Sequence, residues 1–287
     1  MNDFVVFILS NGRPNGIYTL KTLRKYGYTG KVVFVCDNED KELSEYFHKY
    51  KDVEVFDKKR VASQIDEGDN FQDRRAIIYA RNVCFEIAEK LGYKYFIEMD
   101  DDYTYFEYRI YNEESQKPKK IQNLDNVFYL LLDFYKKTPF YTLSMAQGGD
   151  FIGGKNNKMA KKPTIYRKCM NSFICSTDRK FQFVGRINED VNTYTKKQSI
   201  GLLMGTIPMI ALGQKTTQSN KGGMTDLYLD SGTYVKSFYT VMYSPSCCTI
   251  APMGDKHMRL HHRINWDCAV PKIISEDLKK KSIEPPF

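Results

Sequence analysis

The run FVVFIL at residues 4–9 is apolar at every position and passes directly into the polar turn SNGRPNG. A strand that is apolar on both faces is typical of the centre of a parallel sheet, where helices cover both sides. The run KVVFVC at 31–36 has the same character, and the shorter VEVF follows at 53–56. Helical spacing at 17–26 and 41–50 separates these three runs. The order β-α-β-α-β within the first 56 residues predicts a doubly wound α/β sheet.

The overall composition is that of an ordinary globular protein. The chain has 287 residues, of which 42% are hydrophobic and 27% charged, which excludes wholesale disorder and allows a full core. The longest weakly polar stretch, residues 199–213, is shorter than the roughly 20 residues of a membrane span. The N-terminus carries Asp3 where a signal peptide carries positive charge. We therefore expect a soluble, cytoplasmic protein with no membrane attachment.

Cysteine usage and net charge limit the function classes further. The seven cysteines have no metal-type spacing, which favours free thiols in a reducing compartment over a zinc site. The net charge of +8 indicates either a polyanionic partner or a chain that tolerates lysine, and charge alone does not decide between them. Nothing in the sequence indicates an obligate protein partner.

The strongest helical pattern covers residues 73–91 and is closed by Gly92. A strand follows at 95–99 and runs directly into three consecutive aspartates, Asp100 to Asp102. Ligands of open α/β sheets bind at the carboxyl ends of the strands, so Ser10, Asp37 and Asp100 are expected to converge on one crevice. Residues 1–111 are therefore predicted to form a nucleotide-binding half.

The remaining residues, 112–287, are predicted to form a less regular half of the same domain. They open with a polar connector at 112–123, and they contain helical patterns at 124–137 and 189–198 and a strand-like pattern at 201–212. No internal repeat or low-complexity linker interrupts the chain. We therefore predict one continuous domain.

The aspartate triplet needs a physical explanation, because neighbouring carboxylates at the end of a buried strand repel one another and lose hydration. A bound Mg²⁺ or Mn²⁺ removes that cost, and both ions prefer oxygen ligands together with substrate phosphates. The alternative is an acidic turn at the surface. A D-x-D that follows an apolar strand and a β-α-β-α-β segment favours the metal.

Two further groups of charged residues are candidates for the chemistry. Arg74 and Arg81 are seven residues apart and would share one face of the predicted helix, with Asn82 beside them, which suits either a phosphate or ordinary pairing on a solvated face. Glu189 and Asp190 open the later helix. One of them could act as a general base on an attacking hydroxyl, or both could simply complement the helix dipole.

The second half also carries two basic segments. Three of the four histidines, His257, His261 and His262, lie among lysines and arginines, which suits a clamp on a pyrophosphate or a solvated basic loop. One imidazole, taken here as His261, is a further candidate ligand for the metal. The other segment has no acidic residue and suits either a nucleic-acid backbone or plain solvation; it comprises Lys155, Lys158, Lys161, Lys162, Arg167 and Lys168.

Five stretches together resemble a known family: FVVFILSNGRPNG, FQDRRAIIYARN, YFIEMDDDY, GRINEDVNTY and HHRINWDC. They are spread along roughly the whole chain. An apolar strand ending in a polar turn, an Asp after the second strand, an Arg-Asn helix, a strand-end D-x-D and a later Glu-Asp resemble the GT-A glycosyltransferases. More narrowly, the stretches resemble the TET/JBP-associated glycosyltransferases of phage genomes, which are related to the base J glucosyltransferase.

This resemblance implies a GT-A-like fold and the transfer of a hexose from a nucleotide sugar, most simply a UDP-sugar, to the hydroxyl of a 5-hydroxymethylpyrimidine in DNA. It implies an inverting reaction with Mn²⁺ or Mg²⁺, carried out in the host cytoplasm as phage DNA modification. The resemblance also assigns roles position by position. The nucleoside would be held by Ser10, Asn11, Arg13 and Asp37, and the diphosphate or sugar would face Arg74, Arg81 and Asn82. The metal would be bound by Asp100 and Asp102, the donor ribose or sugar would contact Asp101, and Asp190 would be the base, with Glu189 beside it. The triplet is a full Asp-Asp-Asp, so the pair that touches the metal stays open.

Three other functions fit parts of the sequence. A GT-A enzyme acting on polysaccharide, protein or lipid would share the donor half and differ in the acceptor. A nucleotidyltransferase would use the same D-x-D and release pyrophosphate. A non-enzymatic nucleic-acid-binding protein would use the basic segments alone.

Overall fold

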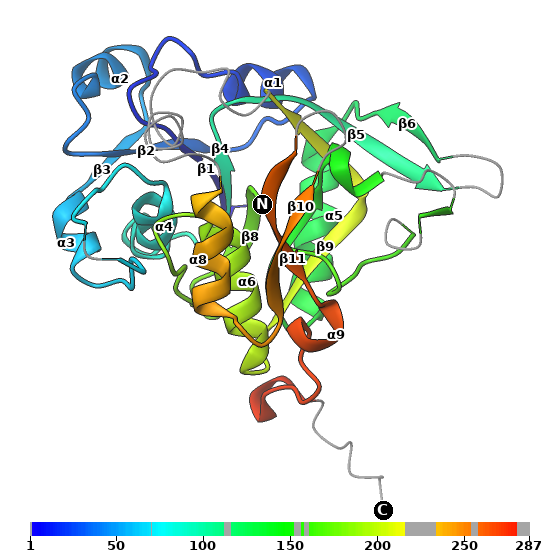
Figure 1. Cartoon of the computed structure of the whole chain (residues 1–287). Helices are drawn as coiled ribbons and strands as arrows, with labels where there is room; N and C mark the ends of the chain where they lie inside the picture. Colours follow the sequence, from blue (N-terminus) through cyan, green and yellow to red (C-terminus); the bar gives the residue numbers. More distant parts are fainter. Residues whose placement is uncertain are drawn as a thin grey trace, which may run out of the picture.

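The computed structural model describes residues 2–69, 71–111, 116–151, 156–157, 161–215, 234–253 and 258–279. These residues form a nine-stranded sheet around which the molecule is built (Figure 1). Four strands are parallel in the order β3-β2-β1-β4, with bounds β1 (Phe4–Leu9), β2 (Val32–Asp37), β3 (Val53–Phe56) and β4 (Tyr95–Asp100). This is the strand order of a mononucleotide-binding half. The predicted α/β class with a Rossmann-like sheet is confirmed.

The sheet continues beyond β4 without a break. β8 (Ser172–Ser176) pairs antiparallel with β4, and the order then runs β8-β7-β9-β5-β6. The other bounds are β5 (Tyr103–Tyr111), β6 (Gln116–Lys120), β7 (Phe140–Ala146) and β9 (Leu203–Gln214). Although β5 follows β4 in the chain, it lies on the far side of the sheet between β9 and β6. The two predicted halves therefore share one sheet.

Each face of the sheet buries its own core. Alternate residues of β1 point to opposite sides, so Val6 and Ile8 belong to one hydrophobic cluster and Val5 and Phe7 to the other. The first cluster is covered by α1 (Thr19–Lys25), α2 (Leu43–Lys49) and α5 (Leu124–Lys137). The second is covered by α3 (Lys58–Ala62), α4 (Ile78–Lys90) and α6 (Glu189–Ser199). Burial on both faces explains why the central strand β1 is apolar at every position.

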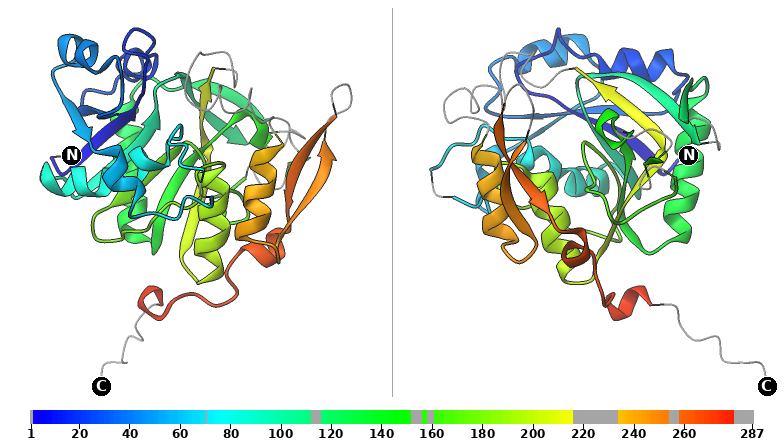
Figure 2. Two further views of the ribbon diagram at one scale, coloured as in Figure 1. Left: turned by 60° about the vertical axis from the view of Figure 1, so that its left-hand side comes forward. Right: turned by 45° about the vertical axis from the view of Figure 1, so that its right-hand side comes forward.

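The C-terminal elements pack on α6 rather than on the sheet. α8 (Val235–Tyr243) contacts α6 and the two strands of a separate antiparallel pair, β10 (Cys248–Met253) and β11 (Arg259–Ile264). Figure 2 shows this pair beside α8 at one side of the molecule. The short helix α9 (Trp266–Ala269) follows, and 3-10 turns occur at η1 (Gly148–Phe151) and η3 (Glu276–Leu278).

Two element predictions are wrong. The helix expected at 73–91 begins only at Ile78, because Gln72 has a φ of 57° and Asp73 Oδ1 accepts from the Arg75 N–H in a local turn. Arg74 is therefore outside the helix and does not share a face with Arg81. Within the expected connector at 112–123, residues 116–120 form β6 and pair with β5.

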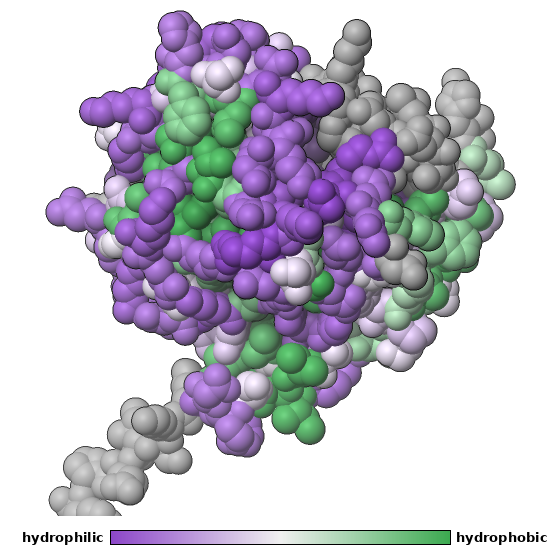
Figure 3. All heavy atoms as spheres, turned by 90° about the vertical axis from the view of Figure 1, so that its left-hand side faces the viewer, coloured by the Kyte–Doolittle hydropathy of each residue, from purple (hydrophilic) through white to green (hydrophobic). Residues whose placement is uncertain are grey.

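The hydropathy of the surface and the state of the cysteines are those expected of a globular protein. The face on the side of α2 and α3 is largely hydrophilic, with a patch of apolar residues surrounded by polar ones (Figure 3). All seven cysteines lie in the described residues and are free, as predicted. Among the helices described, none combines the length and the apolar character that crossing a bilayer requires.

Candidate active site

The carboxyl edge of the parallel strands gathers residues predicted to bind the donor. Ser10 follows β1, Asp37 ends β2 and Asp101 follows β4, and β1 lies between the other two strands. Ser10 Oγ donates to Asp101 Oδ2 at 2.5 Å, and Asn11 Nδ2 donates to Asp37 Oδ2 at 2.8 Å. These strand ends lie side by side as expected, although Ser10 contacts Asp101 rather than Asp100. That Ser10, Asp37 and Asp100 line one ligand crevice stays a prediction.

Asp101 fixes the polar turn that follows β1. Its side chain is 1% exposed, and its Oδ1 lies 3.0 Å from Arg13 Nη2. Burial raises the pKa of Asp101 to about 6, while Arg13 and the Ser10 hydroxyl act in the opposite direction. The Tyr46 hydroxyl lies 2.7 Å from Ser10 Oγ and accepts from the Arg13 N–H at 3.0 Å. Asp101 thus holds Ser10 and Arg13 in place, and its contact with a donor ribose stays a prediction.

Asp37 and Asp40 hold the neighbouring part of the same turn. Lys58 Nζ lies 3.2 Å from Asp37 Oδ2, the oxygen that also accepts from Asn11. Asp40 Oδ2 accepts from the Gly12 N–H at 2.7 Å. Gly12 has a φ of 68°, a conformation in which glycine carries no side-chain penalty. The turn is therefore pre-organised by side chains from β2, α3 and the loop after β2.

Arg81 lies at the centre of a buried charge cluster, which we call the Arg81 cluster: Arg81, Glu98, Asp100 and Glu189. Its Nε lies 3.0 Å from Glu189 Oε1, its Nη2 lies 3.0 Å from Asp100 Oδ1, and its Nη1 lies 3.7 Å from Glu98 Oε2. The guanidinium also lies 4.8 Å from the ring centroid of Phe173. Arg81 is 1% exposed. The side chain predicted to face the donor is thus surrounded by carboxylates from β4 and α6, and its direct contact with a diphosphate stays a prediction.

The environment of the Arg81 cluster shifts the pKa values of its three carboxyl groups. Burial raises the pKa of Asp100, Glu98 and Glu189, and the Arg81 guanidinium acts against that shift in all three. Glu98 is fully buried, and neither of its oxygens has a hydrogen-bond partner among the described residues. Sequence reasoning missed Glu98, although a single acid inside the apolar strand YFIEM was a usable signal.

Of the three aspartates, Asp102 has the fewest polar partners for its side chain among the described residues. Its Oδ1 is buried and has no hydrogen-bond partner among the described residues. Burial raises the pKa of Asp102 to about 7, and the negative charges of Asp100 and Asp101 add to the effect. A carboxylate in this position gains from a nearby cation.

In the described part of the chain, protein ligands alone do not assemble a metal site. Within the described residues, no three His, Cys, Asp or Glu side chains gather closely enough to hold an ion, so Asp100, Asp102 and His261 do not form such a set. His261 lies on β11, where its ring stacks on His262 with centroids 4.2 Å apart. Mg²⁺ is commonly held by one or two carboxylates together with substrate phosphates and water. The unpartnered Asp102 oxygen fits that mode of binding.

Glu189 and Asp190, the first two residues of α6, have different hydrogen-bond and ion-pair partners. Asn188 precedes them with a φ of 61°, and its Nδ2 donates to Thr240 Oγ1 on α8. Glu189 is paired with Arg81, whereas Asp190 Oδ1 accepts from the Val191 N–H of its own helix. Asp190 contributes to the raised pKa of Asp100, so the two carboxylates lie within electrostatic range. Asp190 is the less committed member of the pair.

The remaining predicted donor residues have protein partners. Arg74 Nη2 lies 2.7 Å from Glu39 Oε1 at the surface. Asn82 Nδ2 donates to the Phe183 carbonyl at 3.1 Å, and its Oδ1 accepts from the Phe183 N–H at 2.8 Å. Asn82 therefore ties α4 to the segment before α6.

Arg186 was missed as a structural residue of the site. It is 2% exposed and lies 2.8 Å from Asp69 Oδ2 and 3.3 Å from Asp73 Oδ2. The Tyr239 hydroxyl donates to the same oxygen of Asp69. These bonds join the segment before α4, the segment before α6 and α8. No local sequence signal connects residues more than 100 positions apart.

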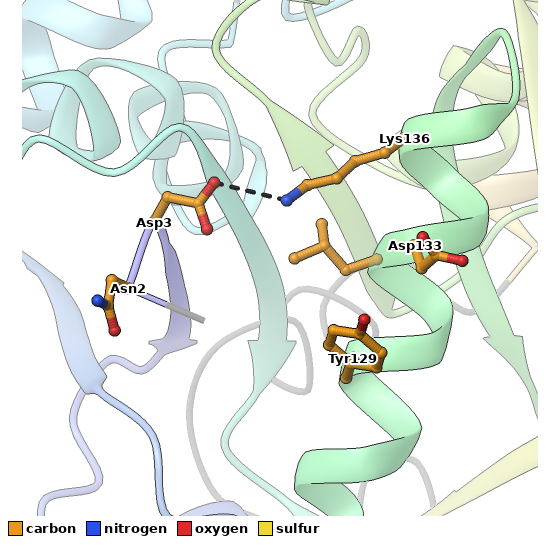
Figure 4. Close-up of a pocket in the computed structure, with 6 residues that line it drawn as sticks. Asn2, Asp3, Tyr129, Asp133 and Lys136 are labelled. Carbon is orange, nitrogen blue, oxygen red and sulfur yellow. Dashed lines mark ion pairs between the residues drawn. The ribbon is translucent and has the colours of Figure 1, made fainter.

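Two clefts of the described structure are relevant to the location of the site. The larger of the two, of about 630 Å³, lies between β9, β11 and the segment that contains Thr164 and Lys168, and we call it the Lys168 cleft: Arg167, Lys168, His261, His262, Arg263 and Trp266 are among its lining residues. The smaller, of about 330 Å³, lies between the start of β1 and α5, where Asp3 pairs with Lys136 at 3.5 Å (Figure 4). It is at the amino end of β1, opposite Ser10, and no predicted site residue lines it.

The parallel strand order, the aspartates at its carboxyl edge and the acidic pair at the start of α6 are features of a nucleotide-sugar glycosyltransferase of the GT-A class. The chain belongs to the TET-Associated Glycosyltransferase family, whose model matches residues 4–223. The predicted family, fold and enzyme class are thus confirmed.

Similar solved structures are distant. Glucosyl-3-phosphoglycerate synthase from Mycobacterium tuberculosis, in complex with Mg²⁺ and UDP, has a TM-score of 0.44 and 8% identity over 91% of this chain and 87% of that one. S. aureus TarS with UDP has a TM-score of 0.47 and 13% identity over 84% of this chain and 64% of that one. No curated protein sequence matches the chain. The assignment therefore depends on the family model.

Proposed function

We propose that this glycosyltransferase moves a hexose from a UDP-sugar to the hydroxyl of a 5-hydroxymethylpyrimidine in DNA, with inversion and with Mn²⁺ or Mg²⁺ as cofactor. The name of the family, TET-associated, supports an acceptor of modified DNA. The reaction belongs to the hypermodification of phage DNA in the cytoplasm of the host cell.

The donor assignment depends most on one observation, the buried and unpartnered Asp102 oxygen at the end of β4. Asp102, with Asp100 as the second candidate, would hold the divalent cation together with the donor phosphates. When bound, this cation supplies positive charge to the leaving diphosphate. Ser10, Asn11, Arg13 and Asp37 are the proposed nucleoside ligands.

Asp190 is the proposed general base. Glu189 already accepts from Arg81 at 3.0 Å, so its carboxylate is held by α4 and orients the start of α6. Asp190 has no ion pair among the described residues and is free to accept the proton of an attacking alcohol. The primary alcohol of a hydroxymethyl base is a weak nucleophile, so a positioned carboxylate raises the rate.

The reaction balances with these groups alone. The acceptor oxygen attacks the anomeric carbon of the sugar, the bond to the nucleoside diphosphate breaks, and the hydroxyl proton goes to Asp190. Direct displacement inverts the anomeric centre. The acceptor base is inaccessible in a duplex, so the enzyme must receive it flipped out or from a melted segment.

The test is a transfer assay read by mass spectrometry. Duplexes carrying 5-hydroxymethylcytosine or 5-hydroxymethyluracil are incubated with Mn²⁺ and a panel of UDP- and GDP-sugars. We expect a hexose-sized mass gain on one duplex that is lost in Asp102→Asn and Asp190→Asn. Asp178→Asn, which removes an exposed carboxylate paired with Lys94, is the matched control and should keep activity.

The outcomes separate the parts of the proposal. Donor hydrolysis without any gain of mass on DNA would eliminate the DNA acceptor and favour a polysaccharide, protein or lipid. Release of pyrophosphate instead of a nucleoside diphosphate would identify a nucleotidyltransferase. A product with retained anomeric configuration, measured by NMR, would rule out direct displacement assisted by Asp190.

A further inference from the structure

The Lys168 cleft is separate from the strand ends that form the proposed donor site. It lies between the segment that contains Thr164 and Lys168, the strand β9 and the strand β11. None of Ser10, Asp37, Asp100 or Asp102 lines it. Its volume of about 630 Å³ is within the range of ligand-binding clefts.

The cleft has an excess of positive charge that ion pairs among the described residues do not cancel. Arg167 is paired with Asp150, and that pair cancels. Lys168 has no ion pair among the described residues, and Arg263 adds a second, exposed cation at the cleft. Burial lowers the pKa of Lys168 to about 8, with Arg167 and Lys236 adding to the shift and Asp190 opposing it. An anion in the cleft would restore the interactions that the Lys168 ammonium lacks.

His262 adds a neutral polar group to the same wall. Burial lowers the pKa of His262 to about 3, and the charge of Lys168 acts in the same direction, so the ring is uncharged at neutral pH. Its Nδ1 lies 3.5 Å from Asn188 Nδ2. A neutral imidazole next to lysine can donate a hydrogen bond to a phosphate oxygen without repelling the lysine ammonium.

The cleft is adjacent to the carboxylate proposed as the base. Asn188, which contacts His262, is two residues before Asp190, and Lys168 interacts electrostatically with Asp190. Trp266, the single tryptophan of the chain, lines the cleft and packs edge-on against Tyr194 of α6 with centroids 5.5 Å apart. Cations next to an aromatic side chain are the usual features of a groove for a nucleic-acid strand.

We propose that the Lys168 cleft binds one phosphodiester group of the acceptor DNA strand, beside the nucleotide presented to Asp190, with Lys168 as the principal cation and Trp266 as a stacking surface for a neighbouring base. This proposal rests on the proposed function, because it supplies the backbone subsite of that same acceptor. The phosphodiester of the acceptor is favoured over the donor diphosphate. His262 of the cleft lies 3.5 Å from Asn188, which precedes α6, whereas no strand-end residue of β1, β2 or β4 lines the cleft.

The test measures DNA binding without catalysis. A fluorescent oligonucleotide with one 5-hydroxymethylcytosine is titrated with protein, and anisotropy is followed between 50 and 200 mM salt. Lys168→Gln should lower the affinity about tenfold at 50 mM salt and make the slope of log K against log salt less steep by about 1. Lys197→Gln is the matched control, because burial also lowers the pKa of Lys197 on α6 and this lysine does not line the cleft.

A second experiment uses the unmodified protein and does not depend on the folding of any variant. Oligonucleotides in which single phosphodiesters next to the modified base are replaced by methylphosphonates are compared for affinity. We expect one linkage at which loss of the charge weakens binding, and at that linkage Lys168→Gln should have no additional effect.

The outcomes distinguish this proposal from the function on which it rests. If the wild type modifies DNA but neither Lys168→Gln nor any methylphosphonate changes its affinity, the subsite is wrong and the function stands. If Lys168→Gln weakens UDP binding in calorimetry and leaves DNA binding intact, the cleft serves the donor instead. If the wild type neither binds nor modifies hydroxymethylated DNA, the proposed function fails first.

Discussion

Replacing Arg81 with methionine should destabilise the protein in a pH-dependent way. Methionine keeps much of the volume and the apolar contact with Phe173, but it removes the cation from three carboxylates of the Arg81 cluster. Removing one partner of a buried ion pair costs about 3–5 kcal/mol of unfolding free energy. Arg81 is 1% exposed and its partners Glu98, Asp100 and Glu189 are 0%, 22% and 11% exposed, so solvent screens the cluster only weakly.

The sign of the pH dependence follows from proton binding. Without Arg81 the folded-state pKa values of the three carboxyl groups rise further, because the guanidinium lowers all three in the wild type. The folded variant then binds more protons than the unfolded chain above the ordinary Asp and Glu values near 4. Its stability therefore falls as pH rises. We expect a loss of about 3–5 kcal/mol at pH 8 and a clearly smaller loss at pH 5.

Urea unfolding followed by Trp266 fluorescence measures both losses. Arg60→Met is the matched control, because it breaks an exposed pair with Glu86 at 2.7 Å and should cost less than about 1 kcal/mol at either pH. A loss in Arg81→Met at pH 8 that equals the control, or one that does not change with pH, would refute the account of the cluster.

Three further predictions follow from the site and its supports. Mn²⁺ should raise the thermal unfolding midpoint of the wild type more at pH 8 than at pH 5.5, because protons compete with the metal for Asp102 below its pKa of about 7. Asp102→Asn should abolish this increase. An increase that is equal at both pH values would contradict the prediction. Asp190→Asn should lower kcat for transfer by about 10²- to 10⁴-fold while UDP affinity in calorimetry stays the same, and a matching loss of UDP affinity would place Asp190 in the donor site instead. Gly185→Ala should cost about 1–3 kcal/mol of unfolding free energy in urea, because the φ of Gly185 is 79° and a Cβ would lie 2.3 Å from Asn192 Nδ2. Gly148→Ala is the control and should be nearly neutral, because a Cβ there would have no described atom within 4 Å. Equal effects of the two substitutions would refute the steric argument.

The regular part of the fold could be predicted from sequence because its signals are local. β1 and β3 occupy the predicted residues, and so does α5, whose apolar positions recur at helical spacing. The β-α-β-α-β succession predicted a doubly wound sheet, and the strand order of its parallel part is known from the structure. The aspartates at the end of β4 followed from the same reasoning, since one edge of such a sheet collects its functional side chains.

The errors come from long-range contacts. The segment after Asp69 has a helical composition, yet Arg186 binds Asp69 and Asp73 and holds that segment in a turn until Ile78. β5 was not predicted, although Tyr103–Tyr111 alternates aromatic and polar residues in a way that is typical of a strand. Its position between β9 and β6 depends on pairing that no local pattern contains.

The site was predicted as a set of residue types rather than as a network. The sequence identifies Arg81, Asp100 and Glu189 as candidates, but Arg81 was assigned to the donor, Asp100 to the metal and Glu189 to a place beside the base, and none to one another. Their mutual distances of about 3 Å arise because α4, β4 and α6 meet at one point, which is a property of the packed fold. Lys168 was part of a predicted basic stretch, and its position beside Asp190 was equally hidden.

The position of β8 has a consequence for synthesis on the ribosome. β4 ends at Asp100, and the strand that covers its outer edge begins only at Ser172, so residues 101–171 must be translated in between. At about 5–20 residues per second this takes roughly 4 to 14 seconds. During that time the nascent chain carries an apolar strand with an open edge, the kind of segment that recruits other chains. A cell that makes this enzyme in quantity must shield that edge until the second half of the chain emerges.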